Sequence, residues 1–356
     1  MVQNRGPVEG LHHHDKEIVV DLFCGMAVLR GADVFAQGIM GCHPGVRRGD
    51  EVSVYTDVDG ACLKGLSKIY SGHKAFVGNG LARLGRDELF CNGGTNLSGI
   101  GIEMTKPLYQ APCLADTLLD RVFAQNLPSI VCGHVLDPKP GELILDMCAA
   151  PGGKTSHIAC LMKNEGRVVA LDKSPQKVQK IYQNCQRWGL SCVEGYVWDA
   201  SKALCEDADA GGGPPFTACS FDRVLVDAPC SALGQRPSFR NKMTAKELKS
   251  YPKYQRKLLA VGVELVKAGG VLVYSTCSLP IEENEGQVEW VLKSYPDLQL
   301  EQQTPYVGQP GLEGTKLSRE QLQLLQRFDP GASVKTHSDW NTDTIGFFLA
   351  KFRRKR

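Results

Sequence analysis

The chain has 356 residues, of which 42% are hydrophobic and 22% are charged, and its formal net charge is +2. This length exceeds what one hydrophobic core usually organises, so two domains are expected. The charge balance is too even to indicate a nucleic-acid-binding protein by itself, and the longest apolar runs are too short to cross a bilayer. The composition therefore predicts a globular protein and leaves its partner open.

The chain ends and the cysteines indicate where the protein works. Residues 1–15 are polar and lack the apolar core of a signal peptide, which predicts a disordered tail. The His12 to His14 triplet in this stretch is expected to be solvated, with a metal site as the alternative. The 14 cysteines are scattered, and no pair has the two-residue spacing of a zinc knuckle. These features predict reduced thiols, a cytoplasmic location and no bound metal. The basic run from Lys351 to Arg356 is expected to be a solvated end, although it could contact phosphate or act in nuclear import.

Between Lys16 and Leu108 the sequence reads as short β segments punctuated by glycine. Val52 and Val54 alternate with Ser53 and Tyr55, as in a half-buried strand. A small barrel or sandwich over residues 16–108 is therefore predicted. Its expected strands are Ala27 to Leu29, Val34 to Ile39, Glu51 to Tyr55, Ala75 to Gly78 and Gly101 to Thr105.

Residues 109–140 are expected to form a helical connecting segment. Apolar residues recur at helical spacing in its first half and predict an amphipathic helix before Pro128. These apolar residues are Leu114, Leu118, Leu119, Val122 and Phe123.

From Gly141 to the end of the chain, strand-like runs alternate with helical ones, and this alternation predicts an α/β domain with a parallel sheet. The clearest helices are expected from Pro175 to Trp188 and from Gln255 to Lys267, the second closed by Ala268 to Gly270. The expected strands are Leu143 to Met147, Val168 to Asp172, Val193 to Trp198, Arg223 to Asp227 and Val271 to Ser275.

Four acids, Asp146, Asp172, Asp199 and Asp227, lie at or just after the ends of four of these strand-like runs, one βα unit apart. In a parallel sheet they would share the edge where open α/β sheets bind ligands. A single such Asp is more often a helix cap, but four in phase favour a polar ligand site.

A glycine-containing loop follows the first of these strands and is predicted to hold a cofactor. It comprises Cys148, Ala149, Ala150, Pro151, Gly152, Gly153 and Lys154. Its paired glycines let backbone amides approach a ligand at a helix N-terminus. A Walker A motif requires glycine at position 148, and the dinucleotide fingerprint is absent. With Asp172 placed to hold a ribose, the loop favours a nucleoside cofactor without an essential pyrophosphate.

Two further strand ends carry thiols, Cys230 after Asp227 and Cys277 after Ser275. A lone strand cysteine is usually a small buried apolar residue. Two thiols on the same sheet edge as a cofactor loop favour a chemical role for both.

These motifs resemble the NOP/Sun family of RNA cytosine-5 methyltransferases. The resemblance rests on the strings Asp146 to Thr155, Asp227 to Cys230 and Ser275 to Ser278, in this order, and covers most of residues 112–356. Residues 16–108 resemble a PUA domain, an RNA-binding β barrel, and its insertion before a Rossmann-like catalytic domain (141–356) is similar to family member six. The resemblance implies S-adenosylmethionine as cofactor and, as substrate, the acceptor-stem cytosine at tRNA position 72 near the 3′ CCA end.

Carbon 5 of cytosine is a poor nucleophile, and a thiolate added to carbon 6 makes it enamine-like. The resemblance assigns this nucleophile to Cys277 and assistance in product release to Cys230. It further implies that Asp227 hydrogen-bonds the cytosine edge, that Lys154 contacts the target or its partners, and that Asp172 and Asp199 hold the cofactor ribose and adenine. Asp146, the loop 148–154 and Asp227 complete the expected cofactor site.

RNA contacts are expected from the PUA-like domain, because the target base must be unstacked while the flanking RNA is held. The phosphate-contact candidates are Arg47, Arg48, Lys64, Lys68 and Lys74, each of which could equally be a solvated charge. The chain is expected to act as a monomer.

Two departures from the family keep other functions open. Only a short stretch precedes the PUA-like region, and the stretch from Gly331 to Asp343 is short for member six. A catalytically impaired RNA-binding protein is therefore one alternative. A methyltransferase acting on another RNA, on DNA or on a small molecule is the other.

Overall fold

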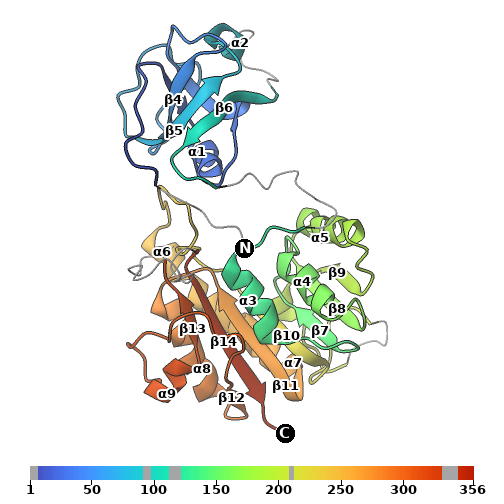
Figure 1. Cartoon of the computed structure of the whole chain (residues 1–356). Helices are drawn as coiled ribbons and strands as arrows, with labels where there is room; N and C mark the ends of the chain where they lie inside the picture. The colour runs from blue at the N-terminus through green and yellow to red at the C-terminus, as the bar shows by residue number, and fades with distance from the viewer. Residues whose placement is uncertain (1–6, 91–97, 112–121, 208–211, 331–343) are drawn as a thin grey trace. The chain divides into compact units, whose positions relative to one another are not determined.

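The structure is a computed structural model, and it describes residues 7–90, 98–111, 122–207, 212–330 and 344–356 (Figure 1). The chain divides into two compact units. The first comprises residues 1–118 together with 237–242, and the second comprises 119–236 and 243–356. Each unit is described below by itself.

The described part of the first unit is built on a six-stranded sheet in the order β2-β6-β5-β4-β1-β3. Strands β1 and β4 run parallel, and the other neighbours are antiparallel. Its core is aliphatic, with Ile18, Val52, Val54 and Ile102 fully buried. The elements are β1 (Glu17–Val20), α1 (Leu22–Val28), β2 (Val34–Phe35), η1 (Ala36–Gly38), β3 (Ile39–Cys42), β4 (Glu51–Asp57), β5 (Lys74–Ala82), α2 (Arg86–Phe90) and β6 (Ile100–Pro107).

Two of the expected β segments in this unit are wrong. Ala27 to Leu29 is the end of helix α1, which begins after Asp21 because that side chain accepts a hydrogen bond from the Cys24 amide at 2.8 Å. The run from Val34 to Ile39 is broken by the 3-10 turn η1 into β2 and β3. The other three segments are confirmed as parts of β4, β5 and β6.

Two segments beyond the predicted barrel belong to the first unit. His12 and His13 are exposed, as predicted, but the segment is held in place: the carbonyl of His12 accepts from Asn79 at 2.7 Å, and the ring of His13 stacks on Phe76 at 4.3 Å. This packing corrects the prediction of a disordered tail for these residues. In the segment 237–242, Phe239 packs against the aliphatic core and Arg240 donates to the carbonyl of Asp59 at 2.7 Å.

The second unit contains an eight-stranded sheet in its described residues, ordered β12-β14-β11-β10-β7-β8-β9, with β13 paired to β14. Strands β7 to β11 are parallel, and β12, β13 and β14 add antiparallel pairs. The elements are α3 (Leu127–Leu136), β7 (Leu143–Asp146), α4 (Gly153–Leu161), β8 (Arg167–Asp172), α5 (Pro175–Arg187), β9 (Val193–Val197), η3 (Ala200–Lys202), β10 (Phe221–Asp227), α6 (Ala245–Leu248), α7 (Tyr251–Leu265), β11 (Val266–Thr276), η4 (Ile281–Glu283), α8 (Glu285–Ser294), β12 (Leu298–Leu300), α9 (Arg319–Gln323), β13 (Gln326–Phe328) and β14 (Phe347–Arg354).

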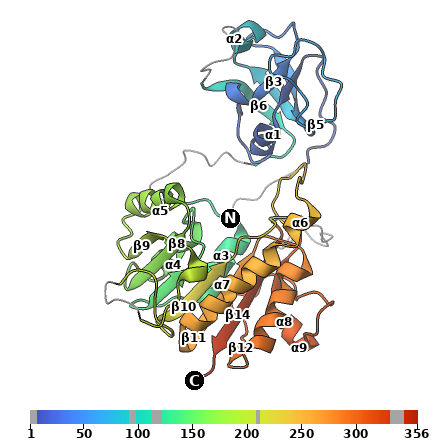
Figure 2. The ribbon, with the colours of Figure 1, turned by 180° about the vertical axis from the view of Figure 1, so that it is seen from behind.

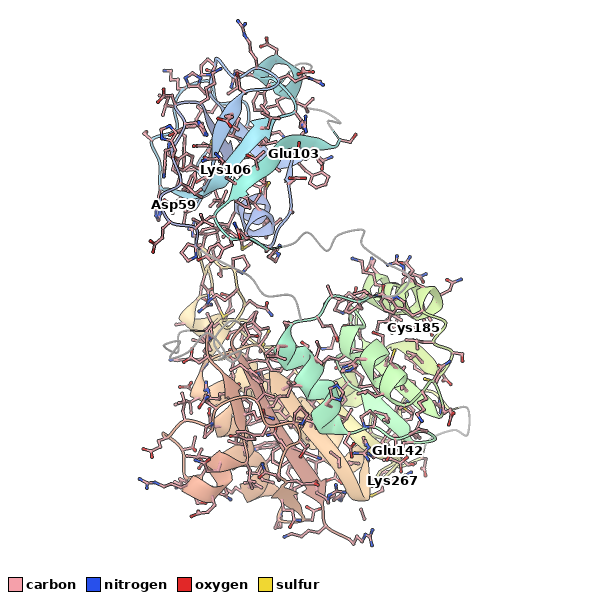
Figure 3. All side chains as sticks on the ribbon, viewed as in Figure 1. Asp59, Glu103, Lys106, Glu142, Cys185 and Lys267 are labelled. Carbon is pink, nitrogen blue, oxygen red and sulfur yellow. The ribbon has the colours of Figure 1, made fainter. Side chains whose placement is uncertain are left out.

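Helices cover both faces of this sheet (Figures 1 and 2). Side chains alternate along each strand, so Ile144 packs with α3, α4 and α5 on one face, while Leu145 packs with α7 and α8 on the other. Burial on both faces explains why the central strands are continuous apolar runs. The amino ends of the strands are charged: Arg223 binds Glu142 at 2.6 Å, and Lys267 binds Asp222 at 2.7 Å (Figure 3).

The predicted α/β architecture is confirmed, with three differences in its elements. Helix α7 ends at Leu265, and Ala268 to Gly270 lie inside the long strand β11 instead of closing the helix. The helix that the structure describes near Pro128 begins at Leu127 and includes that proline, because Asn126 caps it by accepting from the Ser129 amide. Val122 and Phe123 precede it outside any helix.

The third difference concerns the basic end of the chain. Lys351 to Arg354 belong to β14, and Arg354 binds Asp297 at 2.9 Å, so most of this run is part of the sheet. The predictions for Leu114, Leu118 and Leu119 and for the stretch 331–343 lie outside the described residues.

Across the described ranges, no helix is both long and apolar enough to span a bilayer.

We expect Leu272→Ala to destabilise the second unit by about 2–5 kcal/mol, because the deletion leaves a cavity in a fully buried strand. Urea unfolding followed by tryptophan fluorescence measures this effect, since Trp188, Trp198, Trp290 and Trp340 all fall within the residue ranges of that unit. Val197→Ala is the control, because Val197 is 49% exposed and its truncation should cost less than about 0.5 kcal/mol. Equal losses for both variants would contradict the assigned core.

Candidate active site at the carboxyl ends of the sheet

The four predicted acids follow neighbouring parallel strands, as expected. Asp146, Asp172 and Asp227 are the last residues of β7, β8 and β10, and Asp199 follows β9 by two residues. Asp172 accepts from the Ser174 amide at 2.9 Å, and Asp199 forms an ion pair with Lys173 at 3.1 Å. The acids therefore lie along one edge of the sheet, where α/β folds bind ligands.

The loop after β7 turns the chain into helix α4. Gly152 caps the helix with φ of 102°, a conformation that favours glycine. The Thr155 hydroxyl donates to Oδ2 of Asp146 at 2.7 Å and ties the helix to the strand end. The other oxygen, Oδ1 of Asp146, is buried without a hydrogen-bond partner among the described residues. Burial raises the pKa of Asp146 to about 7, so this group is a partly protonated carboxyl with spare hydrogen-bonding capacity.

A charged pair lies between this loop and β10. Nζ of Lys154 is 2.7 Å from Oδ2 of Asp227, and the Ser275 hydroxyl donates to Oδ1 of the same carboxylate at 2.7 Å. Burial opposes the charge of Lys154, but the neighbouring Asp227 raises its pKa and keeps it protonated. Nζ of Lys154 also lies 5.2 Å from the ring centroid of Phe347. The pair is thus fixed in position, and Lys154, Asp227 and Phe347 line the pocket described below.

The two predicted thiols are adjacent. Sγ of Cys230 lies 3.4 Å from Sγ of Cys277, although the residues are on different loops. The hydrogen bond with Cys230 is the largest cause that lowers the pKa of Cys277 to about 7, with a further contribution from Gln235. The same hydrogen bond, followed by burial, raises the pKa of Cys230. The shared hydrogen bond therefore favours the thiolate on Cys277 and the proton on Cys230.

A pocket of about 290 Å³ joins the loop, the charged pair and Cys277. Of the predicted site residues it is lined by Asp146, Cys148, Ala149, Ala150, Pro151, Gly153, Lys154, Asp227 and Cys277. Cys230 contacts Cys277 but does not itself line the pocket. Gly152, Asp172 and Asp199 do not line it either. The charge of Asp172 still contributes to the raised pKa of Cys148, after burial and the closer acids Asp146 and Asp227.

Several lining residues were not predicted from the sequence. They are Phe123, Ala124, Gln125, Asn126, Ser129, Ala228, Gln235, Ile345 and Phe347. Asn126 carried a local signal for a helix start, since asparagine is a common N-cap and Pro128 follows two residues later, but that signal says nothing about a pocket. The others reach the site through tertiary packing from four separate segments.

The arrangement fits a nucleoside-type cofactor at the loop after β7. A Cβ added to Gly153 would lie 2.7 Å from the ring of Phe123, so the backbone is closely covered at this point. Oδ1 of Asp146 offers an unused polar atom at the same place. Glycine at position 153 thus leaves room for the ring of Phe123, and the unpaired oxygen of Asp146 is a polar group of the kind that orients a ligand in an otherwise apolar pocket.

The five phosphate-contact candidates lie in the first unit and differ in their partners. Arg48 binds Glu88 at 2.6 Å, and Lys74 is paired with Glu17 and lies over the ring of Tyr55. Lys64 donates to the carbonyl of Gln37 at 3.2 Å. Among the described residues, no carboxylate forms an ion pair with Arg47 or Lys68, and both are exposed.

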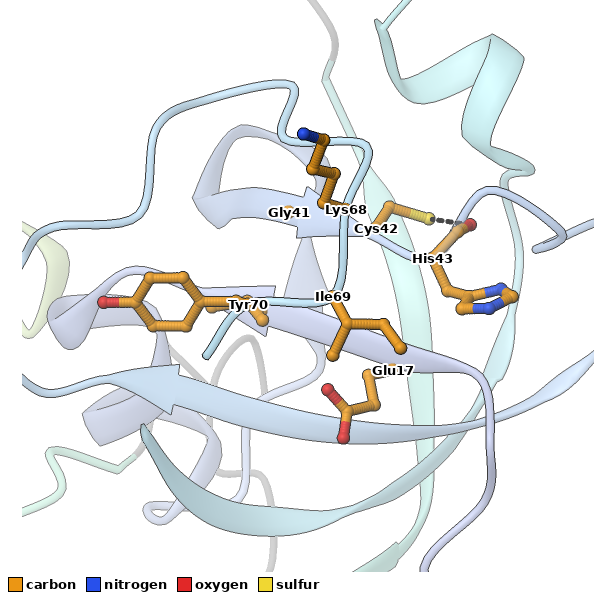
Figure 4. A pocket seen from close by; sticks show the side chains of 8 residues that line it. Glu17, Gly41, Cys42, His43, Lys68, Ile69 and Tyr70 are labelled. Atoms are coloured by element: carbon orange, nitrogen blue, oxygen red, sulfur yellow. Dashed lines mark hydrogen bonds between the residues drawn. The ribbon is translucent and has the colours of Figure 1, made fainter. Parts of the chain in front are cut away.

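A small hollow beside β1 and β3 includes Lys68. In Figure 4 the ammonium group of Lys68 extends away from the carboxylate of Glu17, which is held by Lys74. The charge of Lys68 is therefore available to a ligand outside the hollow.

Comparison with known families gives two matches. Residues 133–353 match the family described as 16S rRNA methyltransferase RsmB/F, and residues 16–92 match the PUA domain. Together the two matches confirm the predicted methyltransferase fold and the predicted PUA domain.

Individual relatives match along nearly the whole chain. The tRNA (cytosine(72)-C(5))-methyltransferase NSUN6 of Mus musculus is 48% identical over 99% of this chain and 77% of its own length. The tRNA (cytosine(72)-C(5))-methyltransferase of Pyrococcus horikoshii is 33% identical over 95% of this chain and 75% of its own. The crystal structure of NSun6 from the same organism, in complex with the S-adenosylmethionine analogue SFG, superposes with a TM-score of 0.80 at 32% identity, covering 99% of this chain and 80% of the other.

We expect alkylation of Cys277 by iodoacetamide to accelerate as the pH rises through about 7, because the thiolate is the reactive form and its pKa is lowered to about 7. In Cys230→Ala the largest cause of that lowering is removed, so the midpoint should move to higher pH. Peptide mapping by mass spectrometry at a series of pH values measures the rate at Cys277. Cys160→Ala, which removes an exposed thiol elsewhere, should leave the midpoint unchanged. An unshifted midpoint in Cys230→Ala would contradict the coupling.

Proposed function

Because the chain belongs to the Sun family of RNA cytosine-5 methyltransferases and carries a PUA domain, we propose that it methylates carbon 5 of cytosine 72 in the acceptor stem of tRNA, near the 3′ CCA end. The observation that carries the proposal is the pair of thiols 3.4 Å apart beside the Lys154–Asp227 pair. A methyltransferase acting on an already nucleophilic atom of DNA or a small molecule needs no such pair.

S-Adenosylmethionine is the proposed cofactor, and when bound it supplies a methyl group on a sulfonium sulfur. The loop 148–153 and Asp146 would hold it through backbone amides and carboxyl oxygens. Asp172 and Asp199, at the ends of the next two strand units, are proposed to contact its ribose and adenine. Asp227 lines the same pocket and would contact both the cofactor and the target base.

Cys277 is the proposed nucleophile. Its thiolate adds to carbon 6 of the cytosine, forming a carbon–sulfur bond and moving the ring electrons toward carbon 5. The charge that develops on the ring is stabilised by Lys154, while Asp227, fixed by Lys154 and Ser275, accepts a hydrogen bond from the edge of the base. These contacts are possible because both side chains line the pocket that contains Cys277.

Cys230 is proposed to act in product release. In the free protein its pKa is raised by the hydrogen bond to Cys277, by burial and by the charge of Cys277. Once Cys277 is bonded to carbon 6, the first and third of these causes disappear, so Cys230 ionises more readily. It can then remove the proton from carbon 5 as the ring double bond re-forms and the Cys277 thiolate departs. The formation of the covalent bond thus activates the group that later breaks it.

The PUA domain is proposed to hold the flanking RNA by phosphate contacts through Arg47, Arg48, Lys64, Lys68 and Lys74. Arg47 and Lys68 are the strongest candidates, since both are exposed and neither is in an ion pair with a described carboxylate. The cytoplasmic location, the monomeric state and the absence of a metal stay predictions.

We expect Cys277→Ala to abolish methyl transfer from labelled S-adenosylmethionine to CCA-ended tRNA transcripts, because no thiolate then activates carbon 5. Cys230→Ala should instead accumulate a protein–RNA adduct visible by denaturing electrophoresis. Cys160→Ala should behave as the unchanged chain. Methyl transfer retained in Cys277→Ala would overturn the mechanism, whereas an unchanged chain that binds tRNA without any transfer would favour an impaired RNA-binding protein.

We further expect Lys68→Ala to weaken tRNA binding and to reduce the slope of log K against log salt by about 0.7–0.9, the effect of one lost phosphate contact. Arg48→Ala is the matched control, because Glu88 already neutralises Arg48, and its slope should change less. Fluorescence anisotropy with labelled tRNA at several salt concentrations measures both. Identical slopes for Lys68→Ala and the unchanged chain would exclude Lys68 as a contact.

A further inference from the structure

A fully buried carboxylate, Glu283, lies behind the two thiols and takes no direct part in the mechanism above. Its Oε2 accepts from the Ser231 amide at 2.9 Å and from Nε2 of Gln255 at 3.0 Å. Its Oε1 accepts from the hydroxyls of Ser231 at 2.5 Å and Ser278 at 2.9 Å. Four donors thus converge on one side chain, which makes it the centre of a buried hydrogen-bond network.

Three of the four donor atoms belong to the two loops that carry the thiols, and the fourth is on Gln255 in helix α7. Ser231 follows Cys230, and Ser278 follows Cys277, so each cysteine is one residue from a bond to Glu283. The two hydroxyl oxygens also lie 2.5 Å apart. The loops leave different strand ends, β10 and β11, and a backbone hydrogen bond from the Gly234 amide to the carbonyl of Cys277 at 3.0 Å also joins them.

Hydrogen bonds to the backbone of Glu283 and to the neighbouring Asn284 fix the position of Glu283. The Tyr274 hydroxyl donates to its carbonyl at 2.6 Å, and the next residue, Asn284, accepts from the Thr276 hydroxyl at 2.6 Å and donates to the carbonyl of Ser278 at 3.0 Å. All three partners are buried in or directly after β11. The carboxylate is therefore held against the strand that leads to Cys277, and from there it reaches across to the loop of Cys230.

Burying a carboxylate is costly unless hydrogen bonds satisfy it, and an apolar residue would fill the same space without that cost. The convergence of its bonds on the two cysteine loops indicates what the charge does. We propose that Glu283 is a positioning residue that clamps the two loops together and so sets the separation of the Cys230 and Cys277 sulfur atoms. The role that this separation serves, transfer of a proton by Cys230 during release, rests on the proposed function.

The clamp can be tested without RNA by the rate at which diamide, which is itself reduced, oxidises the two thiols to a disulfide. We expect Glu283→Leu and Ser231→Ala to slow formation of the Cys230–Cys277 disulfide by about tenfold, because each removes hydrogen bonds that hold the loops in register. Glu283→Gln should restore most of the rate, since its amide can donate to the two serine hydroxyls while its oxygen accepts from the Ser231 amide. Mass spectrometry of non-reduced peptides measures the bond.

Glu285→Gln is the matched control, because Glu285 is also fully buried but binds Arg327 and the Leu312 amide instead of either cysteine loop. Its rate should stay within about twofold of the unchanged chain, although removal of the buried ion pair lowers stability. If Glu283→Leu does not fold, as judged by its circular dichroism, Ser231→Ala decides. The proposal is overturned if either variant, Glu283→Leu or Ser231→Ala, folds and still forms the disulfide as fast as the unchanged chain.

The enzymatic readout separates this inference from the proposed function. Ser231→Ala should accumulate the protein–RNA adduct, as Cys230→Ala does, because formation of the bond to Cys277 is less affected than its release. If the clamp variants form the disulfide slowly but Cys277→Ala retains full methyl transfer, the proposed mechanism is wrong and the clamp is supported. If Cys230→Ala accumulates the adduct but Glu283→Leu forms the disulfide at the normal rate, the mechanism is supported and the clamp is wrong.

Discussion

The register between β10 and β11 determines where the chemical groups of this protein lie. Asp227 pairs with Ser275 at the ends of these parallel strands, and the serine hydroxyl is thereby placed to hold the carboxylate. A short loop follows each strand, and the two loops bring the sulfur atoms of Cys230 and Cys277 to 3.4 Å from each other. A slip of one residue would turn every side chain to the opposite face and separate the groups. Such a slip would exchange the side chains that pack on the two faces of the sheet, and both faces are buried. The hydrophobic core therefore fixes the register and, with it, the geometry of the site.

Charge at this edge is organised around proton sharing. Asp227 raises the pKa of Lys154, and burial raises the pKa of Asp146 to about 7. The hydrogen bond between the two cysteines lowers the pKa of Cys277 and raises that of Cys230. Each of these groups therefore responds to a change in its neighbour's charge. A covalent bond to Cys277 would remove both its thiolate charge and its hydrogen bond with Cys230, and would therefore lower the pKa of Cys230. The chemistry proposed here needs that response, because the same two sulfur atoms must first make and then release a bond.

The sequence predicted the features that depend on local periodicity and on motifs. The strand ends with Asp146, Asp172 and Asp227, the loop at Gly152 and the paired thiols were all recognisable in this way, because glycine, acids and cysteine recur at strand termini. Features set by contacts between distant segments could not be predicted. Helix α1 was missed for a different reason: its cap by Asp21 is local, but the apolar run from Ala27 to Leu29 also fits a strand. Lys351 to Arg354 look like a solvated end, and only the pairing with β11 and β12 makes them a strand.

The first unit is discontinuous in sequence, since residues 237–242 belong to it although they lie between β10 and α6. Phe239 fills part of the aliphatic core of the PUA domain, and Arg240 closes a bond to Asp59. The PUA domain is therefore not expected to be exchanged in evolution without residues 237–242. Transplanting residues 16–108 alone would leave a vacancy where Phe239 packs, and any exchange between family members must carry both pieces together. Changes in the PUA domain and in residues 237–242 are thus expected to have been inherited together.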